Sequence, residues 1–368
     1  MKKFLPNLLV LLISLMVCLI ILEFTARSVG REYFIQNNAF MLKDYPVFSY
    51  KPNNQYEVTR PEFTNTVRIN SKGLRDYDYG YAKGNSTKRI IMLGDSMIAA
   101  IELPLRKTVS KKLEFLLNEG KKPNGGNFEV INMGFTGFGP TAEIIALEKE
   151  GIKYNPDIVI LNLYAGNDFV RIDFGVSGDI GQEIFAVHDS LENLTMKSMP
   201  MQKLKNYFFR NYFTYSFLRK VISDAIAEED PMFSDSLIYS QEYPDYIERN
   251  IGKLDTELAH LKRFADYKGI TLLVVVLPTK EQVDMYESYT TGNKGIMNPS
   301  MALTKAQEEI LEIGKRHNIT MLDILPEFSR KNENNTFYFH DDPHWNEEGH
   351  ALAAELEYNF LLKEGLVG

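Results

Sequence analysis

The sequence has almost no cysteine and no block of basic residues. Its 368 residues include one cysteine, Cys18, which stands inside an apolar run, so a disulfide framework and cysteine catalysis are excluded. The 41 lysines and arginines are outnumbered by 49 acidic residues, for a net charge of −8. Nucleic acid is therefore not expected as a partner. With 24 glycines and 15 prolines, the composition is that of a globular enzyme, not of a collagen-like or disordered chain.

Charge is also absent from one long stretch near the amino terminus. Residues 4–22 are nineteen uncharged and mostly apolar residues. At about 1.5 Å per residue, this stretch approaches the roughly 30 Å thickness of a bilayer's hydrocarbon core. A cleaved signal peptide is the alternative, but no small-residue cleavage site follows the stretch. A lipoprotein signal at Cys18 is disfavoured because Met16 and Val17 are not small residues.

We therefore predict that residues 1–28 form a cytoplasmic leader and an uncleaved transmembrane signal anchor. Positive charge barely decides the orientation of this anchor in the membrane, because Lys2 and Lys3 precede the apolar stretch and Arg27 and Arg31 follow it. The short leader favours an amino terminus in the cytoplasm. The rest of this single-pass protein is then expected on the periplasmic or extracellular side.

Beyond residue 87, short apolar runs alternate with helical periods. The runs are rich in Ile, Val and Leu and are bounded by Gly, Asn, Asp or Pro, as expected for strands buried on both faces of a parallel sheet. The predicted strands are Ile90–Leu93, Val130–Asn132, Ile158–Leu163, Leu272–Leu277 and Met321–Ile324. The predicted helices are Val109–Leu117, Ala142–Tyr154, Ile247–Tyr267, Met301–His317 and Glu347–Leu362. This alternation predicts a three-layer α/β/α sandwich over residues 88–368, with ligands bound beyond the carboxyl ends of the strands.

Two regions do not follow this alternation. Residues 29–87 carry scattered prolines and aromatic residues without a helical period, and we predict an irregular amino-terminal extension packed on the sandwich. Residues 170–246 are far longer than an ordinary connection and contain an aromatic cluster at Tyr207–Phe217. We predict a mostly helical insertion, which either packs on the core or forms a cap over the active site or a surface that rests on a membrane or a partner.

Residues able to do chemistry follow three of the predicted strands. The first strand ends in Gly94-Asp95-Ser96, which brings a hydroxyl to the ligand-binding rim, although this tripeptide is also common in turns. The turn after the second strand contains Gly134 and Gly137, which either permit positive φ or present backbone N–H groups to an anion. Asn167 follows the third strand and is either a cap or a donor to developing negative charge.

The segment before the last predicted helix is the most specific. Asp341 and His344 stand three residues apart in a turn held by Pro343. This spacing allows the carboxylate to accept from one imidazole nitrogen while the other nitrogen faces a serine. Asp342, offset by two residues, is expected to point elsewhere. A metal site is the alternative, with ligands from His340, Asp341, Asp342, His344 and His350. Histidines four residues apart bind a metal best on a helix, and Pro343 argues against a helix in this segment.

Taken together and in order, these segments resemble the four sequence blocks of the SGNH (GDSL-type) hydrolases. The blocks are Gly94-Asp95-Ser96, Gly137, Gly166-Asn167-Asp168 and Asp341-x-x-His344. The resemblance implies a flavodoxin-like sandwich with no required metal and no other cofactor. It also implies roles for three side chains: Ser96 as nucleophile, His344 as general base and then acid, and Asp341 as the carboxylate that orients the imidazole.

The same resemblance implies an oxyanion hole. Its donors would be the backbone N–H groups of Ser96 and Gly137 and the side chain of Asn167, with Gly134 as the alternative to Gly137. A serine activated by an imidazole, with donors facing a developing oxyanion, performs acyl transfer from an ester to water or to another hydroxyl.

Two shorter similarities concern the substrate. The segment Asp341–His350 is similar to a motif of envelope SGNH proteins that handle O-acetyl groups on polysaccharides, and Val274–Lys280 is similar to a segment of the alginate acetylation proteins. We expect an O-acetylesterase or O-acetyltransferase that acts on a carbohydrate or small acyl-ester substrate, with a multi-pass acyltransferase as a candidate partner. The alternatives are a lipase or thioesterase-like hydrolase at the membrane and a non-catalytic glycan-binding or scaffold protein.

Overall fold

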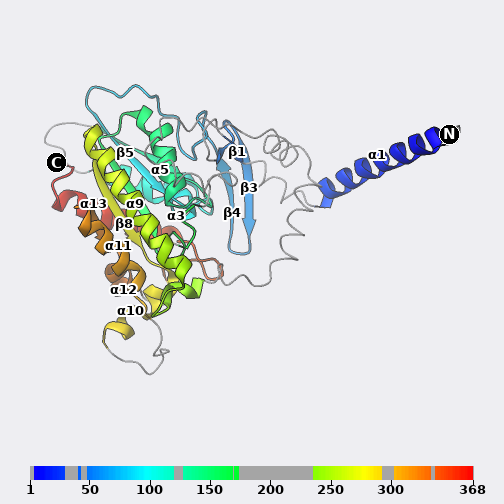
Figure 1. Ribbon diagram of the computed structural model, residues 1–368. Helices are drawn as coiled ribbons and strands as arrows, with labels where there is room; N and C mark the ends of the chain where they lie inside the picture. The colour runs from blue at the N-terminus through cyan, green and yellow to red at the C-terminus, as the bar shows by residue number, and fades with distance from the viewer. Residues whose placement is uncertain are drawn as a thin grey trace.

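The main body of the protein is a parallel sheet with helices on both faces (Figure 1). The computed structural model describes residues 4–29, 40–42, 48–119, 127–168, 170–173, 235–291, 302–332 and 336–367. Most of the predicted insertion, including the Tyr207–Phe217 cluster, lies outside the described residues.

All five predicted strands are present, and they pair in parallel in one sheet. They are β5 (Thr87–Gly94), β6 (Asn127–Gly134), β7 (Ile158–Tyr164), β8 (Thr271–Leu277) and β9 (Thr320–Asp323). Their order is β6-β5-β7-β8-β9, which is the flavodoxin-like order 2-1-3-4-5. The order reverses between β5 and β7, so a ligand crevice is expected outside the carboxyl ends of these two strands.

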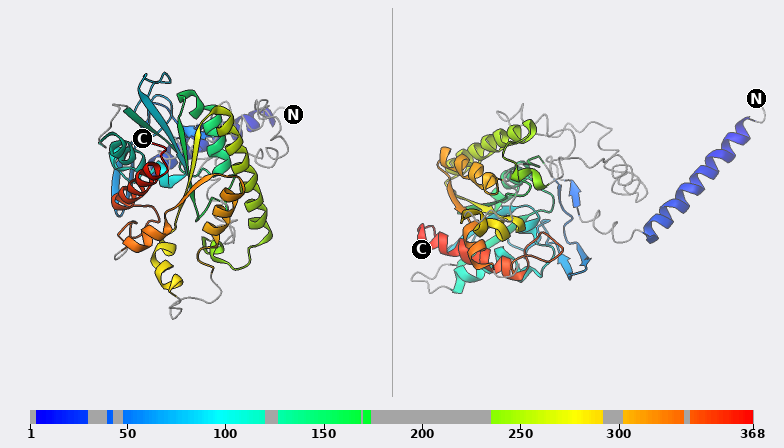
Figure 2. Two further views of the ribbon diagram at one scale, coloured as in Figure 1. Left: turned by 90° about the vertical axis from the view of Figure 1, so that its left-hand side faces the viewer. Right: turned by 90° about the horizontal axis from the view of Figure 1, so that it is seen from below.

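The helices form a layer on each side of the sheet (Figure 2). Helices α5 (Pro140–Lys149), α9 (Asp245–Lys268) and α11 (Lys305–Arg316) share one hydrophobic cluster with the strands. Helices α4 (Val109–Glu119), α12 (Leu325–Lys331) and α13 (Glu347–Lys363) share the other. Successive side chains of β5 enter opposite clusters, since strand residues alternate between faces. The predicted α/β fold is therefore confirmed, and helices α10 (Lys280–Thr290) and α12 are additions to the predicted set.

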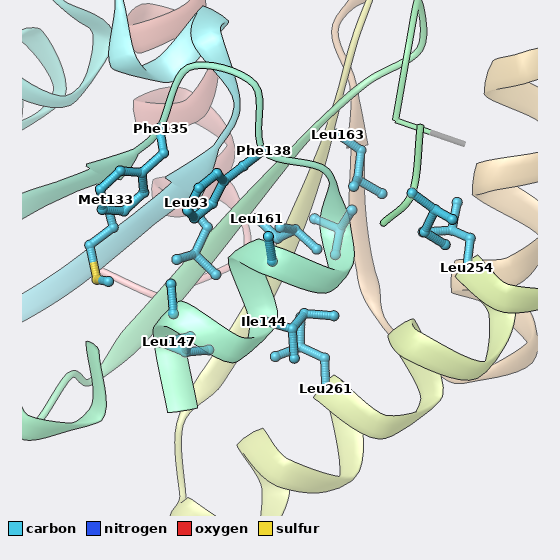
Figure 3. Packing of buried hydrophobic residues seen from close by; sticks show 14 of the residues in the cluster. Leu93, Met133, Phe135, Phe138, Ile144, Leu147, Leu161, Leu163, Leu254 and Leu261 are labelled. Carbon is cyan, nitrogen blue, oxygen red and sulfur yellow. The ribbon is translucent and has the colours of Figure 1, made fainter. Parts of the chain in front are cut away.

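The core between the sheet and helices α5 and α9 holds the strand ends in place. Figure 3 shows leucines of β5 and β7 facing the side chains of both helices. Burial of each such side chain contributes about 1.5–3 kcal/mol. The labelled residues from these elements are Leu93, Leu161, Leu163, Ile144, Leu147, Leu254 and Leu261. The loops that carry the candidate site residues therefore extend from a rigid, packed part of the sheet.

The amino-terminal extension is more regular than expected. Strands β1 (Phe40–Leu42) and β2 (Phe48–Tyr50) form one antiparallel pair, and β3 (Gln55–Arg60) and β4 (Phe63–Arg68) form another. The second pair places Val58 and Val67 in the same cluster as α5 and α9. Through this second pair, the extension packs on the sandwich.

At the amino terminus the chain forms helix α1 (Phe4–Val29), which contains the apolar run. Within the part of the chain that the structure describes, no helix combines the length and the apolar content needed to cross a bilayer. The predicted anchor stays a prediction.

Candidate active site

Ser96 lies at the carboxyl end of β5. It begins the one-turn helix α3 (Ser96–Ala99), which Asp95 caps by accepting the N–H of Met97 at 2.8 Å. The end of β6 lies against this turn, because a Cβ on Gly134 would stand 2.3 Å from the backbone nitrogen of Ala99. Glycine is required at that contact. Ser96 is thereby held beside the point where the strand order reverses.

His344 lies in the loop that precedes α13, and its Nε2 is 2.8 Å from the Oγ of Ser96. A β-bridge between Tyr338 and Trp345 closes the loop. Asn346 ties the loop to the helix: its amide donates to the Tyr338 carbonyl at 3.1 Å, and its oxygen accepts the first N–H groups of α13. The structure therefore brings together Ser96 and His344, as the sequence predicts.

The carboxylate on His344 is that of Asp342. Its Oδ1 lies 2.5 Å from the His344 Nδ1 and accepts the backbone N–H of the same residue at 3.0 Å. Such a turn, in which a side chain accepts the N–H two residues on, folds the carboxylate toward the ring. Asp341 instead lies 2.6 Å from the Nδ1 of His340, with 68% of its side chain exposed. The expected pairing of Asp341 with His344 is corrected accordingly.

The amino-terminal extension holds this loop from outside. The Glu62 carboxylate, at the tip of the β3–β4 hairpin, accepts the backbone N–H groups of His340 at 2.6 Å and Asp341 at 2.7 Å. From the sandwich, Lys280 donates to the carbonyls of Phe339 and His340 at 3.0 and 2.8 Å. The backbone around His344 is thus fixed by charged side chains from two distant parts of the chain.

The local charge favours a protonated imidazole. Burial disfavours the imidazolium, but the hydrogen bond to Asp342 and the nearby carboxylates of Glu102 and Asp95 outweigh it and raise the pKa of His344 to about 9. Burial raises the pKa of Asp342, but the hydrogen bonds and charge of His344, together with the charge of Arg60, lower this pKa below its usual range. The pair is therefore an ion pair at neutral pH.

The predicted oxyanion donors lie on the two loops beside Ser96. The N–H of Gly134 already donates to the Asn132 side chain at 2.8 Å, which favours Gly137 over Gly134. Gly137 has a φ of +78°, and no atom lies within 4 Å of where its Cβ would stand. The Nδ2 of Asn167 lies 3.2 Å from Asp95 Oδ2, next to the nucleophile. The oxyanion role of these groups stays a prediction.

Three carboxyl groups are buried beneath the turn that contains Ser96. Burial raises the pKa of Asp95, Glu143 and Asp168, and the mutual repulsion of the three raises the pKa of Glu143 and Asp168 further. Neither oxygen of Glu143 has a hydrogen-bond partner within the described residues. Across the same residues, no group of three or more His, Cys, Asp or Glu side chains has the arrangement of a metal site.

Several residues of the site were not predicted. Tyr50, at the end of β2, accepts the N–H of Thr136 at 3.0 Å and so holds the loop that carries Gly137. Glu62 and Glu102 reach the site from loops with no recognisable motif. Asp342 was visible beside Asp341, but sequence spacing alone could not choose between them.

Comparison of the sequence with models of protein families indicates the class of enzyme. Residues 231–358 match the model of an SGNH hydrolase-like domain, that of the acetyltransferase AlgX. The matched region contains Asp342 and His344, whereas Ser96 precedes it. The match confirms the resemblance to SGNH hydrolases and to O-acetylation proteins, and with it the class of enzyme, an ester hydrolase or O-acyltransferase.

Solved structures provide further similar chains. A lipase/acylhydrolase from Enterococcus faecalis is 13% identical and covers 75% of this chain and 96% of that chain, with a TM-score of 0.41. An acetylxylan esterase from Geobacillus stearothermophilus is 11% identical, with 76% and 94% covered and a TM-score of 0.41. A two-domain esterase active on acetylated mannans is 14% identical, with 75% and 49% covered and a TM-score of 0.41. No curated protein sequence matches this chain.

Proposed function

We propose that this protein is a serine esterase of the SGNH type that removes or transfers O-acetyl groups on a cell-envelope carbohydrate. One observation carries the proposal, namely a chain of contacts through the ring of His344. Its Nε2 lies 2.8 Å from Ser96 Oγ, and its Nδ1 lies 2.5 Å from Asp342 Oδ1. This is the order of groups by which a carboxylate orients an imidazole and the imidazole activates a serine.

The reaction follows from this order. His344 Nε2 takes the proton of Ser96 as Oγ bonds to the ester carbonyl carbon. The ester C–O bond then breaks, and His344 returns the proton to the leaving alcohol. Water or an acceptor hydroxyl next attacks the acyl-serine by the same steps in reverse, so that hydrolysis and transfer differ only in the second nucleophile. Gly137, Asn167 and the Ser96 N–H would stabilise the oxyanion.

The acetyl group and the carbohydrate are supported by sequence similarity. Residues 231–358 resemble a domain of an acetyltransferase, and the loop that contains His344 lies within that region. A transferase outside the cytoplasm needs an acetyl donor there, which a multi-pass acyltransferase partner would supply. A hydrolase needs none.

The location proposed for the domain rests on α1. Its apolar side chains are exposed to an extent that is unusual for a globular protein, including Val10 at 63% and Phe24 at 74%. An apolar helix of this kind is stabilised by insertion into lipid. We therefore keep the expectation of a membrane-anchored, exported domain.

The catalytic assignment is tested with Ser96→Ala, His344→Ala and the double variant on p-nitrophenyl acetate. Each single variant should lose nearly all activity, and the double variant should be hardly worse, because residues that act as one unit give non-additive losses. A serine-directed phosphonate should add mass at Ser96, and chelators should leave activity intact. Full activity in folded Ser96→Ala would end the proposal.

The substrate is tested on a panel of p-nitrophenyl acetate, butyrate and palmitate, together with the acetyl content of the envelope glycan in a deletion strain. Preference for acetate supports the proposal. Preference for palmitate would indicate the lipase alternative. Binding of glycan without turnover of any ester would indicate the scaffold alternative. A loss of glycan acetylation on deletion identifies a transferase, and a gain identifies an esterase.

A further inference from the structure

We infer that Glu102 is a second carboxylate of the active site, which acts on the same ring nitrogen of His344 as Asp342 does. The inference rests on the proposed function, since it assigns a positioning residue to the serine esterase. Its basis is a buried carboxylate that has one oxygen beside the imidazole of His344 and the other without a hydrogen-bond partner within the described residues.

The contact is close, and Glu102 is buried. Glu102 Oε1 lies 3.7 Å from His344 Nδ1, and the Glu102 side chain is only 5% exposed. Its Oε2 is buried and has no hydrogen-bond partner within the described residues. A buried carboxylate with an oxygen that lacks a partner is costly unless a nearby positive charge compensates it. The imidazolium of His344 is such a charge.

The backbone around Glu102 is held on both sides. Helix α3 is followed by its cap residue Ala100, whose φ of +47° is left-handed and turns the chain out of the helix. The Asn65 amide donates to the carbonyls of Ile101 at 2.8 Å and Leu103 at 2.7 Å. Glu102 therefore lies between two anchored peptide groups, and its side chain is aimed by the backbone rather than by partners of its own.

Arg75 completes this support. Its guanidinium is buried and donates to the carbonyls of Ala99, at 2.5 Å, and Leu103. Arg75 also opposes the effect of burial, which raises the pKa of Glu102. Its charge favours the ionised form of Glu102 and so the ion pair with His344.

The charge on His344 depends on every element around it. Burial disfavours the imidazolium, and the carboxylates of Asp342, Glu102 and Asp95 favour it. Titratable and charged groups surround His344 on several elements. They are Asp342 in its own loop, Arg60 in the β3–β4 hairpin, Glu102 and Arg75 on the opposite side, Asp95 before α3, and His350 on α13. His350 is itself kept neutral, since burial lowers its pKa to about 3.

Two consequences follow for the reaction. Glu102 stabilises the imidazolium that forms when His344 accepts the Ser96 proton. It also makes the base form of His344 harder to reach at low pH, because a negative charge within about 4 Å raises the pKa of a titrating cation. When Asp342 is removed, Glu102 remains as a carboxylate 3.7 Å from Nδ1.

The first experiment is the pH profile of kcat/KM for Glu102→Gln on p-nitrophenyl acetate, with the full-length chain. Activity requires neutral His344, so the wild-type profile should rise with a midpoint near 9. In Glu102→Gln this midpoint should move toward lower pH by about one pH unit, the effect expected of one nearby charge. Glu102→Asp keeps the charge but retracts it by one methylene, so its midpoint should shift downward by less than that of Glu102→Gln. Asp341→Asn removes an exposed carboxylate from the same loop and is the control.

The second experiment is a double-mutant cycle between Glu102 and Asp342. In the wild type, Glu102→Gln should lower kcat at its own optimal pH by less than about tenfold. In the Asp342→Asn background, the same substitution should cost at least ten times more, since residues that share a partner couple. Additive losses would overturn the inference.

The outcomes separate the two proposals. An unchanged midpoint in Glu102→Gln, with Ser96→Ala inactive, overturns the role of Glu102 and leaves the esterase intact. An active Ser96→Ala overturns the esterase itself. If Glu102→Gln does not fold, as judged by thermal melting, the test passes to Glu102→Asp: its retracted carboxylate should move the midpoint slightly downward, and an upward or zero shift would reject the inference.

Discussion

Asp342 reaches the ring of His344 because the same carboxylate oxygen also accepts the His344 backbone N–H. We expect Asp342→Ala to lower kcat by about 10²-fold or more but by less than the roughly 10⁴-fold known for loss of such a carboxylate, since Glu102 remains. Asp341→Ala should change kcat by about twofold or less, as expected for an exposed side chain. Kinetics on p-nitrophenyl acetate measure both, with melting curves to confirm folding. A larger loss at Asp341 would contradict the geometry.

Asn167 is the second residue whose role can be measured directly. Its Nδ2 lies 3.2 Å from Asp95 Oδ2, beside the nucleophile. Asn167→Ala should lower kcat by roughly 10²–10³-fold with little change in KM, because an oxyanion donor acts mainly on charge that develops in the transition state. The control is Asn250→Ala, which removes an amide that donates to the Val170 carbonyl at 3.0 Å. Equal kinetics for both variants would reduce Asn167 to a capping residue.

Among the elements, helix α13 carries an unusual group. Glu357 is fully buried, and neither of its oxygens has a partner within the described residues. Burial raises its pKa to about 8. Since the unfolded chain releases this proton near pH 4.5, the carboxyl destabilises the fold progressively as the pH rises from about 4.5 to about 8, and the cost then levels off.

The prediction concerns Glu357→Gln, which cannot ionise. Its stability relative to the wild type should increase by a few kcal/mol (order of magnitude) between pH 5 and pH 8, as measured by urea unfolding at each pH. Glu355→Gln on the same helix removes an exposed carboxylate that lies 3.4 Å from Lys331 and should show no comparable trend. A constant difference between wild type and Glu357→Gln across this range would place the carboxyl in contact with water.

The amino-terminal extension belongs to the active site as much as to the fold. Glu62 holds the loop that contains His344, and Tyr50 holds the loop that contains Gly137. Asn65 holds the peptide groups beside Glu102. Three loops that meet at Ser96 are therefore positioned by one segment that precedes the sandwich in the chain.

For the whole molecule, the prediction concerns attachment to the membrane. The full-length chain should remain in the membrane fraction after alkaline carbonate extraction, with its domain open to protease only from the non-cytoplasmic side. Ile13→Arg, which places a charge within the apolar run at a cost of about 2.5–3.5 kcal/mol in a bilayer, should weaken retention, and Asn7→Gln should not. A mature amino terminus near residue 27 would instead identify a cleaved signal peptide.

Local pattern determined the sheet. Runs such as Ile158–Leu161 are apolar on both faces, and this requirement of a strand inside a parallel sheet can be recognised in a few consecutive residues. Strands that alternate with amphipathic helices leave few topologies, so the sandwich and the placement of Ser96 at a strand end follow from the sequence by itself. The pairing of Ser96 with His344 was likewise predictable, because each stands in a recognisable block beside the same sheet edge.

Tertiary structure decided what local pattern cannot contain. Whether Asp341 or Asp342 meets the imidazole depends on the backbone angles of one turn, since the two carboxylates are adjacent in the chain. That turn is held by Glu62, which lies 279 residues from Asp341. Glu102 enters the site through the left-handed backbone at Ala100. Such contacts join residues with no sequence relation, and only the packed chain brings their charges within range of His344.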